Sequence, residues 1–192
     1  MTTNFSWLSR TELLVGKEAI YKLSNSHIMI VGLGGVGSFA AEFIARSGVG
    51  KMTIIDGDIV DPTNRNRQLP ALATNHGISK AEIMAERLQS INPELELVVV
   101  KQFLNPEMVQ QQIEQRPSYI IDAIDSITPK LTFISMAYNQ NISIVSSMGA
   151  GGRVDPIMLK VADISKTYNC PFAQQIRKQL NPNYALDTID VI

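Results

Sequence analysis

The stretch HIMIVGLGGVGSFAAEFIARSGVGKMTIID, residues 27–56, decides the fold. It begins with a β-rich apolar run at 27–31, continues through a glycine-rich loop at 32–37, and returns to a β-rich run at 52–55. Between these runs, residues 36–47 have the spacing and the alanine content of a helix. A strand, a glycine loop, a helix and a second strand in this order are typical of a nucleotide-binding unit with parallel strands.

The rest of the chain continues the alternation of short β-rich runs and helical patterns. Helices are predicted at 11–23, at 80–91, after the N-cap Asn105, at 128–138 with Thr128 as the N-cap, and at 171–180. Strands are predicted at 95–100, 119–121 and 142–146. Segments 153–155 and 158–161 are expected to pair as a hairpin or an edge. We therefore predict an α/β fold: a Rossmann-like, doubly wound, mostly parallel sheet with helices on both faces and a C-terminal antiparallel edge.

Composition narrows the class of protein. The chain has 192 residues, 45% of them apolar and 18% charged, so it is long enough for one sizeable core and too short for two ordinary domains. We expect one domain at 1–180 and an irregular tail at 181–192. The formal net charge of −1 excludes a generally basic nucleic-acid binder.

The single cysteine, Cys170, excludes a disulfide framework and a four-cysteine zinc site within the chain. It suits a reducing, cytoplasmic compartment. The longest uncharged run lies between Lys130 and Arg153 and contains several Asn, Ser and Gly residues, so we expect no membrane insertion of this chain.

The glycine loop has the spacing of a phosphate-binding turn. Gly32 permits the tight turn, Gly34 lets a phosphate approach the backbone, and Gly37 lets helix and strand pack closely. The N–H groups at the helix start attract an anion. Asp56 follows at the spacing of an acid that binds a ribose hydroxyl. The same motif can be a tight turn only, and by itself it leaves NAD, FAD and ATP open.

The residues after Asp56 favour ATP. The loop DGDIVDPTNRNRQ at 56–68 carries arginines, and Lys80 opens the next helix. An enzyme that splits ATP between the α- and β-phosphates needs cations there, because charge builds on the departing pyrophosphate. Arg67 can fork onto phosphate oxygens, and Lys80 adds a point charge. Taken singly, Arg65 and Arg67 could be exposed residues of a solvated loop, and Lys80 could be an exposed residue at a helix start. Taken together, the three residues favour an enzyme that binds phosphates over one that transfers hydride.

A second acidic segment, DAIDS at 122–126, follows the fourth predicted strand. The carboxyl ends of parallel strands face the ligand crevice, so Asp125 is a candidate to hold Mg²⁺. Asp122 is interpreted as a residue that shapes the loop.

Four motifs together resemble the ThiF-type adenylating superfamily, the relatives of ubiquitin-activating enzymes. They are GLGGVG at 32–37, DGDIVDPTNRNRQ at 56–68, SKAE at 79–82 and the second aspartate of DAIDS. Within that superfamily, LVGKEAIYKL, NRQLPAL, YIIDAIDSITPK and GAGGRVDP are similar to the tRNA threonylcarbamoyladenosine dehydratases, and the likeness extends to about Leu180.

This resemblance implies ATP-dependent activation of the carboxylate of N6-threonylcarbamoyladenosine at position 37 of tRNA. Loss of AMP from the acyl-adenylate during ring closure would give the cyclic, dehydrated base. Carried over position by position, the resemblance implies a site at Gly34, Gly35, Gly37, Asp56, Asp58, Asn64, Arg67, Gln68, Lys80 and the Mg²⁺-associated Asp125. Arg10 resembles an arginine that reaches across a homodimer to the partner's ATP.

Two other functions stay open at this stage. The chain could adenylate the C-terminus of a ubiquitin-like sulfur-carrier protein, although the paired CxxC zinc motifs common in those relatives are absent. It could also be a nucleotide-binding module or an NAD enzyme, which would leave Arg67, Lys80 and Asp125 without a purpose. Ring closure needs no thioester, so Cys170 is interpreted as an ordinary cysteine beside a helix start.

The family further implies several partners. We expect ATP and Mg²⁺, a monovalent cation (Na⁺ or K⁺), a tRNA substrate, a homodimer, and a cysteine desulfurase or sulfur-acceptor partner. Because the helical pattern fades at Asn181, where the relatives continue, we also expect that the functional protein extends beyond Ile192.

Overall fold

The computed structural model of the chain describes residues 5–180 and 190–191. The chain divides into two compact units, Met1–Phe103 and Leu104–Ile192. We call them the N-terminal unit and the C-terminal unit and describe each by itself.

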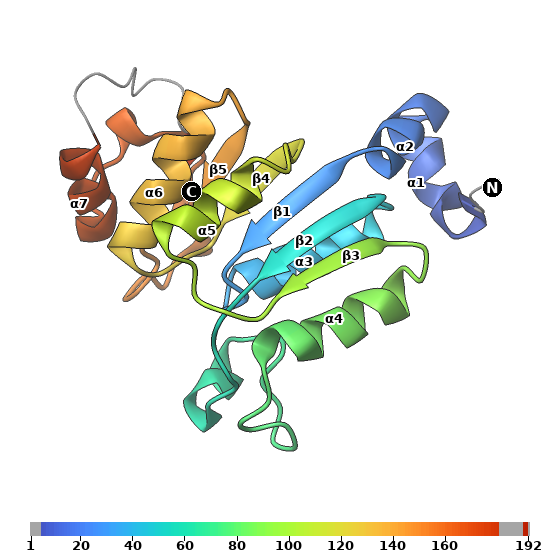
Figure 1. The fold of residues 1–192 in the computed structure, drawn as a ribbon, viewed down its shortest axis with the longest axis horizontal. Coiled ribbons are helices and arrows are strands. Elements are labelled where there is room, and N and C mark those ends of the chain that lie inside the picture. The colour runs from blue at the N-terminus through green and yellow to red at the C-terminus, as the bar shows by residue number, and fades with distance from the viewer. Residues whose placement is uncertain (1–4, 181–189, 192) are drawn as a thin grey trace. The chain divides into compact units, whose positions relative to one another are not determined.

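The N-terminal unit is an α/β unit with parallel strands (Figure 1). Its helices are α1 (Ser9–Val15), α2 (Lys17–Ser24), α3 (Gly37–Arg46) and α4 (Lys80–Ile91), its strands are β1 (His27–Val31), β2 (Lys51–Ile55) and β3 (Glu96–Val100), and short 3-10 helices span Phe5–Leu8 and Pro62–Asn66. Apart from the first two helices, these elements confirm the ranges expected from periodicity to within a residue or two.

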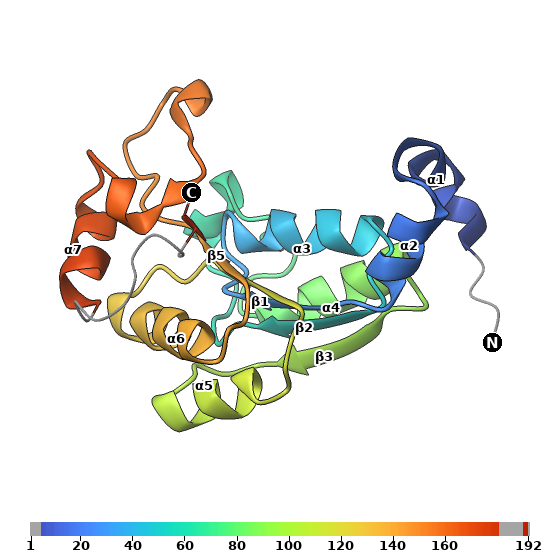
Figure 2. The same cartoon turned by 90° about the horizontal axis from the view of Figure 1, so that it is seen from above.

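The strands of the N-terminal unit lie in the order β3-β2-β1, and both pairs are parallel. Ile30 of β1 lies opposite Ile54 of β2, and both are fully buried. Helix α3 packs on β1 and on α4, and its Ala41 and Ala45 are buried at that contact surface. Figure 2 shows α3 lying over one face of these strands. The packing holds the glycine loop between β1 and α3 on a rigid base.

The single helix expected at 11–23 is wrong. The structure has two helices, α1 and α2, separated at Gly16. Gly16 has φ +83°, a left-handed conformation that glycine adopts without a steric penalty, and its N–H closes α1 on the carbonyl of Glu12. The helical spacing continues on both sides of the break, which is why periodicity did not reveal it.

The C-terminal unit alternates helices and strands as well. Its elements are α5 (Pro106–Ile113), β4 (Tyr119–Asp122), α6 (Ile127–Asn139), β5 (Ile144–Ser146), β6 (Ala162–Asp163), α7 (Pro171–Gln179), β7 (Asp190–Val191) and 3-10 helices at Pro156–Met158 and Ile164–Lys166. Its strands lie in the order β4-β5-β7-β6. The first two pairs are parallel and the pair β6–β7 is antiparallel, which confirms the antiparallel edge.

Two local expectations in the C-terminal unit are wrong. Segments 153–155 and 158–161 form no hairpin, because the Asp155 carboxylate accepts a hydrogen bond from the N–H of Ile157 at 3.0 Å and turns the chain into a 3-10 helix. Thr128 is no N-cap: α6 begins earlier, at Ile127, and the Thr128 carbonyl accepts from the Thr132 hydroxyl within the helix. Pro129 is tolerated there because the first turn needs no intrahelical N–H donor.

The asparagine cap of α5 is confirmed, since the Asn105 side chain accepts from the N–H of Met108 at 2.9 Å. Of the tail expected to be irregular, residues 181–189 and 192 lie outside the described residues. Among the described residues, no helix combines the length and the apolar character that crossing a membrane requires.

Gly57 follows β2 where the backbone runs close to the end of β3. A Cβ at this position would lie 2.5 Å from the backbone nitrogen of Phe103 and 2.8 Å from the carbonyl carbon of Gln102. We expect Gly57→Ala to lower the free energy of unfolding by about 1–3 kcal/mol, because the overpacked backbone must shift. Urea unfolding followed by circular dichroism measures this loss.

Gly151→Ala is the matched control, because a Cβ at Gly151 would meet no atom within 4 Å. Equal stability of the two variants would show that the approach of Gly57 to the end of β3 is not a constraint on this fold.

Candidate functional site

The glycine loop turns the chain sharply from β1 into α3. Gly32 has φ +87°, and its N–H donates to the carbonyl of Ile55 at 2.8 Å, which ties the loop to β2. At the other end of the loop, the Ser38 hydroxyl donates to the carbonyl of Gly34 at 2.5 Å. The Ser38 N–H donates to the same Gly34 carbonyl at 3.3 Å. The dipole at the start of α3 still favours an anion there.

Asp56 links the glycine loop to the segment after β2. Its carboxylate accepts the N–H of Leu33 at 2.6 Å and the N–H of Asp58 at 2.7 Å, one at each oxygen. Burial raises the pKa of Asp56, although both backbone hydrogen bonds act in the opposite direction. A carboxylate has about four acceptor positions, so a ribose hydroxyl still finds a free lone pair.

The polar segment from Asp56 to Ser79 closes on itself. Ile59 and Ser79 form an isolated antiparallel bridge, and the N–H of Val60 donates to the carbonyl of Ile78 at 2.9 Å. This closure brings the first residue of α4 back beside the end of β2. There Lys80 Nζ lies 2.8 Å from Asp58 Oδ2.

Lys80 is buried, whereas its partner is not. The side chain of Lys80 is 6% exposed and that of Asp58 is 52% exposed. The alternative of an exposed helix-start lysine is therefore wrong. The ammonium is held in place by a carboxylate that keeps most of its hydration.

Arg67 and Gln68 lie against the glycines of the loop. A Cβ on Gly35 would meet Cγ of Arg67 at 3.4 Å, and one on Gly34 would meet Nε2 of Gln68 at 3.7 Å. The Arg67 guanidinium donates only to neutral oxygens, those of Thr63 at 3.3 Å and Asn66 at 3.0 Å. Its charge therefore has no carboxylate partner among residues 5–180.

Gln68 leaves a buried hydrogen-bond acceptor unused. The residue is 9% exposed, and its Oε1 is the one buried side-chain oxygen or nitrogen without a hydrogen-bond partner in the described part of the chain. Leaving a buried polar atom unpaired costs free energy. The Nε2 of the same amide lies beside Gly34, so a ligand bound at the glycine loop could supply the missing donor.

Asn64 has a structural task in this site. Its Oδ1 accepts the N–H of Asp61 at 3.1 Å, while the Asp61 carboxylate accepts the N–H of Thr63 at 2.8 Å. This reciprocal capping box begins the 3-10 helix Pro62–Asn66. Asn64 thus shapes the loop that presents Arg67.

The remaining predicted residues lie on other elements of the chain. Arg10 lies on α1, is exposed, and makes no hydrogen bond or ion pair with the described residues. Asp125 belongs to the C-terminal unit and is exposed in the loop between β4 and α6. Asp122, in the same loop region, accepts the N–H of Ile124 at 3.0 Å, in agreement with a loop-shaping role.

Sequence reasoning missed Lys130, which lies beside Asp122. The two side chains form an ion pair of 2.7 Å in the C-terminal unit, and neither is exposed to solvent. One signal was present: Lys130 is the only charged residue of α6, whose sequence is otherwise largely apolar. A lysine that is buried together with such an apolar helix needs an acidic partner, because a charged side chain is almost never buried unpaired.

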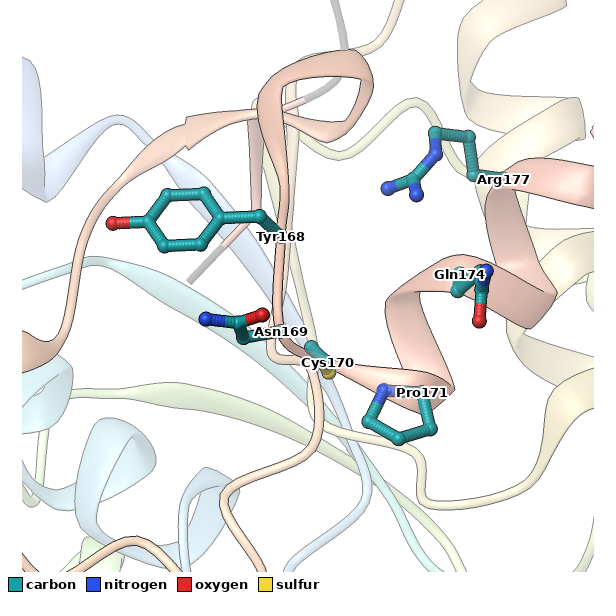
Figure 3. Close-up of a pocket in the computed structure, with 6 residues that line it drawn as sticks. All are labelled: Tyr168, Asn169, Cys170, Pro171, Gln174 and Arg177. Atoms are coloured by element: carbon teal, nitrogen blue, oxygen red, sulfur yellow. The ribbon is translucent and has the colours of Figure 1, made fainter.

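A pocket of about 380 Å³ opens at the start of α7 (Figure 3). Cys170 lines it and caps the helix, since its sulfur accepts the N–H of Ala173 at 3.3 Å. Figure 3 shows the Arg177 guanidinium directed from α7 toward the segment of Tyr168. That guanidinium donates to the carbonyl oxygens of Ile164 at 3.4 Å and Thr167 at 3.1 Å, so the charge anchors its own loop.

In chemical terms, the N-terminal unit joins a helix start, a buried lysine, an unpaired arginine charge and an orphaned amide oxygen around one glycine loop. Such an arrangement binds an anionic group and neutralises charge that develops on it. Among the described residues, no group of three or more His, Cys, Asp or Glu side chains could hold a metal ion.

The chain is similar to known proteins over nearly its whole length. The chain is 44% identical over 184 residues to the tRNA threonylcarbamoyladenosine dehydratase of Escherichia coli (strain K12), a match that covers 94% of this chain and 69% of the relative. It is 42% identical over 184 residues to the protein of the same name from Bacillus subtilis (strain 168), covering 96% of this chain and 72% of the relative.

A solved structure extends the likeness to three dimensions. The crystal structure of the E. coli tRNA N6-threonylcarbamoyladenosine dehydratase in complex with ATP has a TM-score of 0.94 and 40% identity, and the match covers 100% of this chain and 82% of that chain. This likeness confirms the Rossmann-like α/β fold. The model of the ThiF family matches residues 8–191. The chain therefore belongs to the ThiF family and, within it, to the tRNA threonylcarbamoyladenosine dehydratases.

Proposed function

We propose that this protein catalyses the ATP-dependent dehydration of N6-threonylcarbamoyladenosine at position 37 of tRNA. The carboxylate of the modified base would attack the α-phosphate of ATP, forming an acyl-adenylate and releasing pyrophosphate. A nitrogen (giving a hydantoin) or the carbamoyl oxygen (giving an oxazolone) of the same side chain would then attack the acyl carbon, close the ring and expel AMP. One carboxylate oxygen leaves with AMP, so the base loses the elements of water.

The observation that carries the proposal is the cation pair beside the glycine loop. Arg67 lies against Gly35. Asp58, in the loop that follows β2, pairs with the Lys80 ammonium at 2.8 Å. A relative that matches the whole chain at a TM-score of 0.94 was crystallised with ATP. The same residues in this chain can therefore be expected to hold the phosphates of ATP.

Each residue has a task that follows from its surroundings. A carboxylate attacks a phosphate poorly because both are anionic, and Arg67 and Lys80 offset that repulsion. The amides at the start of α3 hold phosphate oxygens. Asp56 accepts from the ribose, and Gln68 gains a donor for its orphaned oxygen.

We extend the proposal to Mg²⁺. Proteins bind this ion through one or two carboxylates together with substrate phosphates and water. Asp125 fits that role because its exposed carboxylate makes no hydrogen bond or ion pair with the described residues. When bound, Mg²⁺ would neutralise phosphate charge. The monovalent cation and the sulfur-handling partner stay predictions of the family resemblance.

We also propose a homodimer in which Arg10 serves the partner's site. Helices α1 and α2 and the turn before them carry an exposed apolar surface made of Trp7, Leu13, Leu14, Val15 and Tyr21. Exposed apolar patches mark interaction surfaces. Arg10 lies on the same helix with an unpaired charge, so a second copy docked there would receive it.

The remaining parts of the proposal concern the chain as a whole. We propose that residues 1–180 act as one adenylation domain working in the cytoplasm, where tRNA is modified. Cys170 has no catalytic task in it, because ring closure needs no thioester and its sulfur caps α7.

The direct test uses tRNA that carries threonylcarbamoyladenosine. Incubation with the protein, ATP and Mg²⁺, followed by mass spectrometry of the nucleosides, should show a loss of about 18 Da from that nucleoside, the mass of one water lost on ring closure after activation by adenylation. No mass change, together with pyrophosphate exchange stimulated by a small carrier protein, would favour the sulfur-carrier alternative. NADH turnover without ATP consumption would contradict both.

Lys80→Met should lower the rate of tRNA dehydration by about 10²–10³-fold, the usual effect of removing one group that stabilises developing charge. Folding should survive, because Asp58 is half exposed and stays hydrated without its partner. Single-turnover kinetics and thermal unfolding measure the two effects.

Lys101→Met is the control for Lys80→Met. Lys101 pairs with Glu82 on the surface, and both side chains are about half exposed. A Lys80→Met protein as active as the Lys101→Met protein would remove Lys80 from the site.

Mixing inactive variants tests whether Arg10 acts across the dimer. Arg10→Ala and Lys80→Met should each be inactive as homodimers, whereas a heterodimer contains one complete site. Random exchange of equal amounts should therefore restore about a quarter of the wild-type activity, because half of the dimers are mixed and each has one working site. Activity no greater than the sum of the separate variants would place Arg10 in its own subunit's site or outside any site.

A further inference from the structure

A fully buried polar cluster lies in the C-terminal unit, outside the nucleotide site described above. We call it the Lys130 cluster; it comprises Asp122, Lys130, Ser146 and the backbone carbonyl of Ser147. Asp122 and Lys130 have no exposed side-chain surface, and Ser146 is also fully buried. None of these residues is among the nucleotide-binding or metal-binding residues predicted from the sequence.

Every donor of the Lys130 ammonium is used. Lys130 Nζ donates to Asp122 Oδ2 at 2.7 Å, to the Ser146 hydroxyl at 3.0 Å and to the Ser147 carbonyl at 3.0 Å. An ammonium has three N–H bonds, so its donors are saturated. The Ser146 hydroxyl in turn donates to Asp122 Oδ2 at 2.6 Å.

The main effect of the Lys130 cluster is to fix the positions of the elements that it joins, rather than to raise the free energy of unfolding. Moving two charges out of water costs about as much free energy as their mutual attraction gains. Replacing a buried ion pair with apolar side chains therefore often leaves the stability of the fold unchanged. In contrast, because each N–H of the Lys130 ammonium already has its acceptor, the cluster permits only one arrangement of the groups that contribute to it. Here these groups are the end of β4, the end of β5 and the first turn of α6.

The loop that carries Asp125 lies between the two charged members of the cluster. Asp122 ends β4, and Lys130 lies in the first turns of α6, eight positions later. The second oxygen of Asp122 accepts the N–H of Ile124 at 3.0 Å, within this loop. The ion pair therefore closes the loop at both ends and also holds its interior.

The charge of Asp125 acts on the ammonium of the Lys130 cluster. Burial lowers the pKa of Lys130, and the neighbouring Asp122 and Asp125 carboxylates partly oppose that shift. Lys130 Nζ also lies 5.7 Å from the centre of the Phe172 ring, in the first turn of α7. The same ammonium thus contacts a fourth element of the unit.

We propose that Lys130 is a positioning residue for the predicted Mg²⁺ ligand Asp125: with Asp122, it holds the 123–126 loop in the arrangement that the Mg²⁺–ATP complex requires. The role in Mg²⁺ binding rests on the proposed function, whereas the hold on the loop does not. Lys130 touches no reacting atom in this role.

Two variants separate positioning from stability. Lys130→Met leaves the Asp122 carboxylate buried and unpaired, so a large drop in melting temperature is expected. The double variant Asp122→Leu with Lys130→Met removes both charges and should recover most of that drop. Lys166→Met, which removes an exposed lysine of the same unit, is the control for the loss of one positive charge.

The first measurement is amide hydrogen exchange of residues 123–126 without nucleotide or metal. In the double variant we expect this loop to exchange at least about tenfold faster than in the wild type and in Lys166→Met, because the hydrogen bond at Ile124 and the closing ion pair are lost. Unchanged exchange in a folded double variant would overturn the proposal without reference to any activity.

The second measurement is the Mg²⁺ concentration that gives half-maximal ATP turnover with the modified tRNA. We expect the double variant to need at least about tenfold more Mg²⁺, because the loop must be ordered at each binding event. ATP binding in the presence of EDTA should stay within about twofold of the wild type, because the site lies in the N-terminal unit. A Mg²⁺ requirement equal to that of Lys166→Met would overturn the link to Asp125.

The two measurements distinguish failure of this inference from failure of the proposed function. A wild-type protein that leaves the tRNA nucleoside unchanged would refute the dehydratase proposal and, with it, the link to Mg²⁺–ATP. Faster exchange in the double variant would still support the hold of Lys130 on the loop.

Discussion

The Asp56 carboxylate is the interaction on which the nucleotide site depends. One oxygen accepts the N–H of Leu33 in the glycine loop, and the other accepts the N–H of Asp58 in the loop that follows β2. Two segments separated by a helix and a strand are thereby held in one geometry. Asp58 then holds Lys80, so the order of contacts runs from the glycine loop to the buried Lys80 ammonium through two carboxylates.

The regular elements were predictable because their signals are local. The βαβ core at 27–55 and α4 follow from apolar periodicity, and the Asn105–Pro106 start of α5 follows from capping chemistry. The break at Gly16 was not predictable, because helical spacing continues on both sides and a single glycine inside such a pattern does not by itself end a helix. The expected pairing of 153–155 failed because the Asp155–Pro156 turn outweighs β propensity.

The candidate site was likewise predictable only in part. The residue types at Asp56, Arg67 and Lys80 could be identified from the sequence, since phosphate chemistry demands them after a glycine loop. Their surroundings could not be identified. The burial of Lys80 depends on closure of the chain between 59 and 79, and the ion pair of Asp122 with Lys130 forms only when β4, β5 and α6 meet.

The two lysine–aspartate pairs found among the described residues illustrate two uses of the same chemistry. Lys80 is buried but its partner is half exposed, so the ammonium keeps one loosely held acceptor and can turn toward a phosphate at low cost. Lys130 and Asp122 are both sealed from water and every donor of the ammonium is used, so the pair cannot exchange partners without exposing an uncompensated charge. A cation that must meet an incoming anion needs the first arrangement. A cation that must keep a neighbouring loop in place needs the second, and this difference in solvent exposure is the physical basis for assigning chemistry to Lys80 and positioning to Lys130.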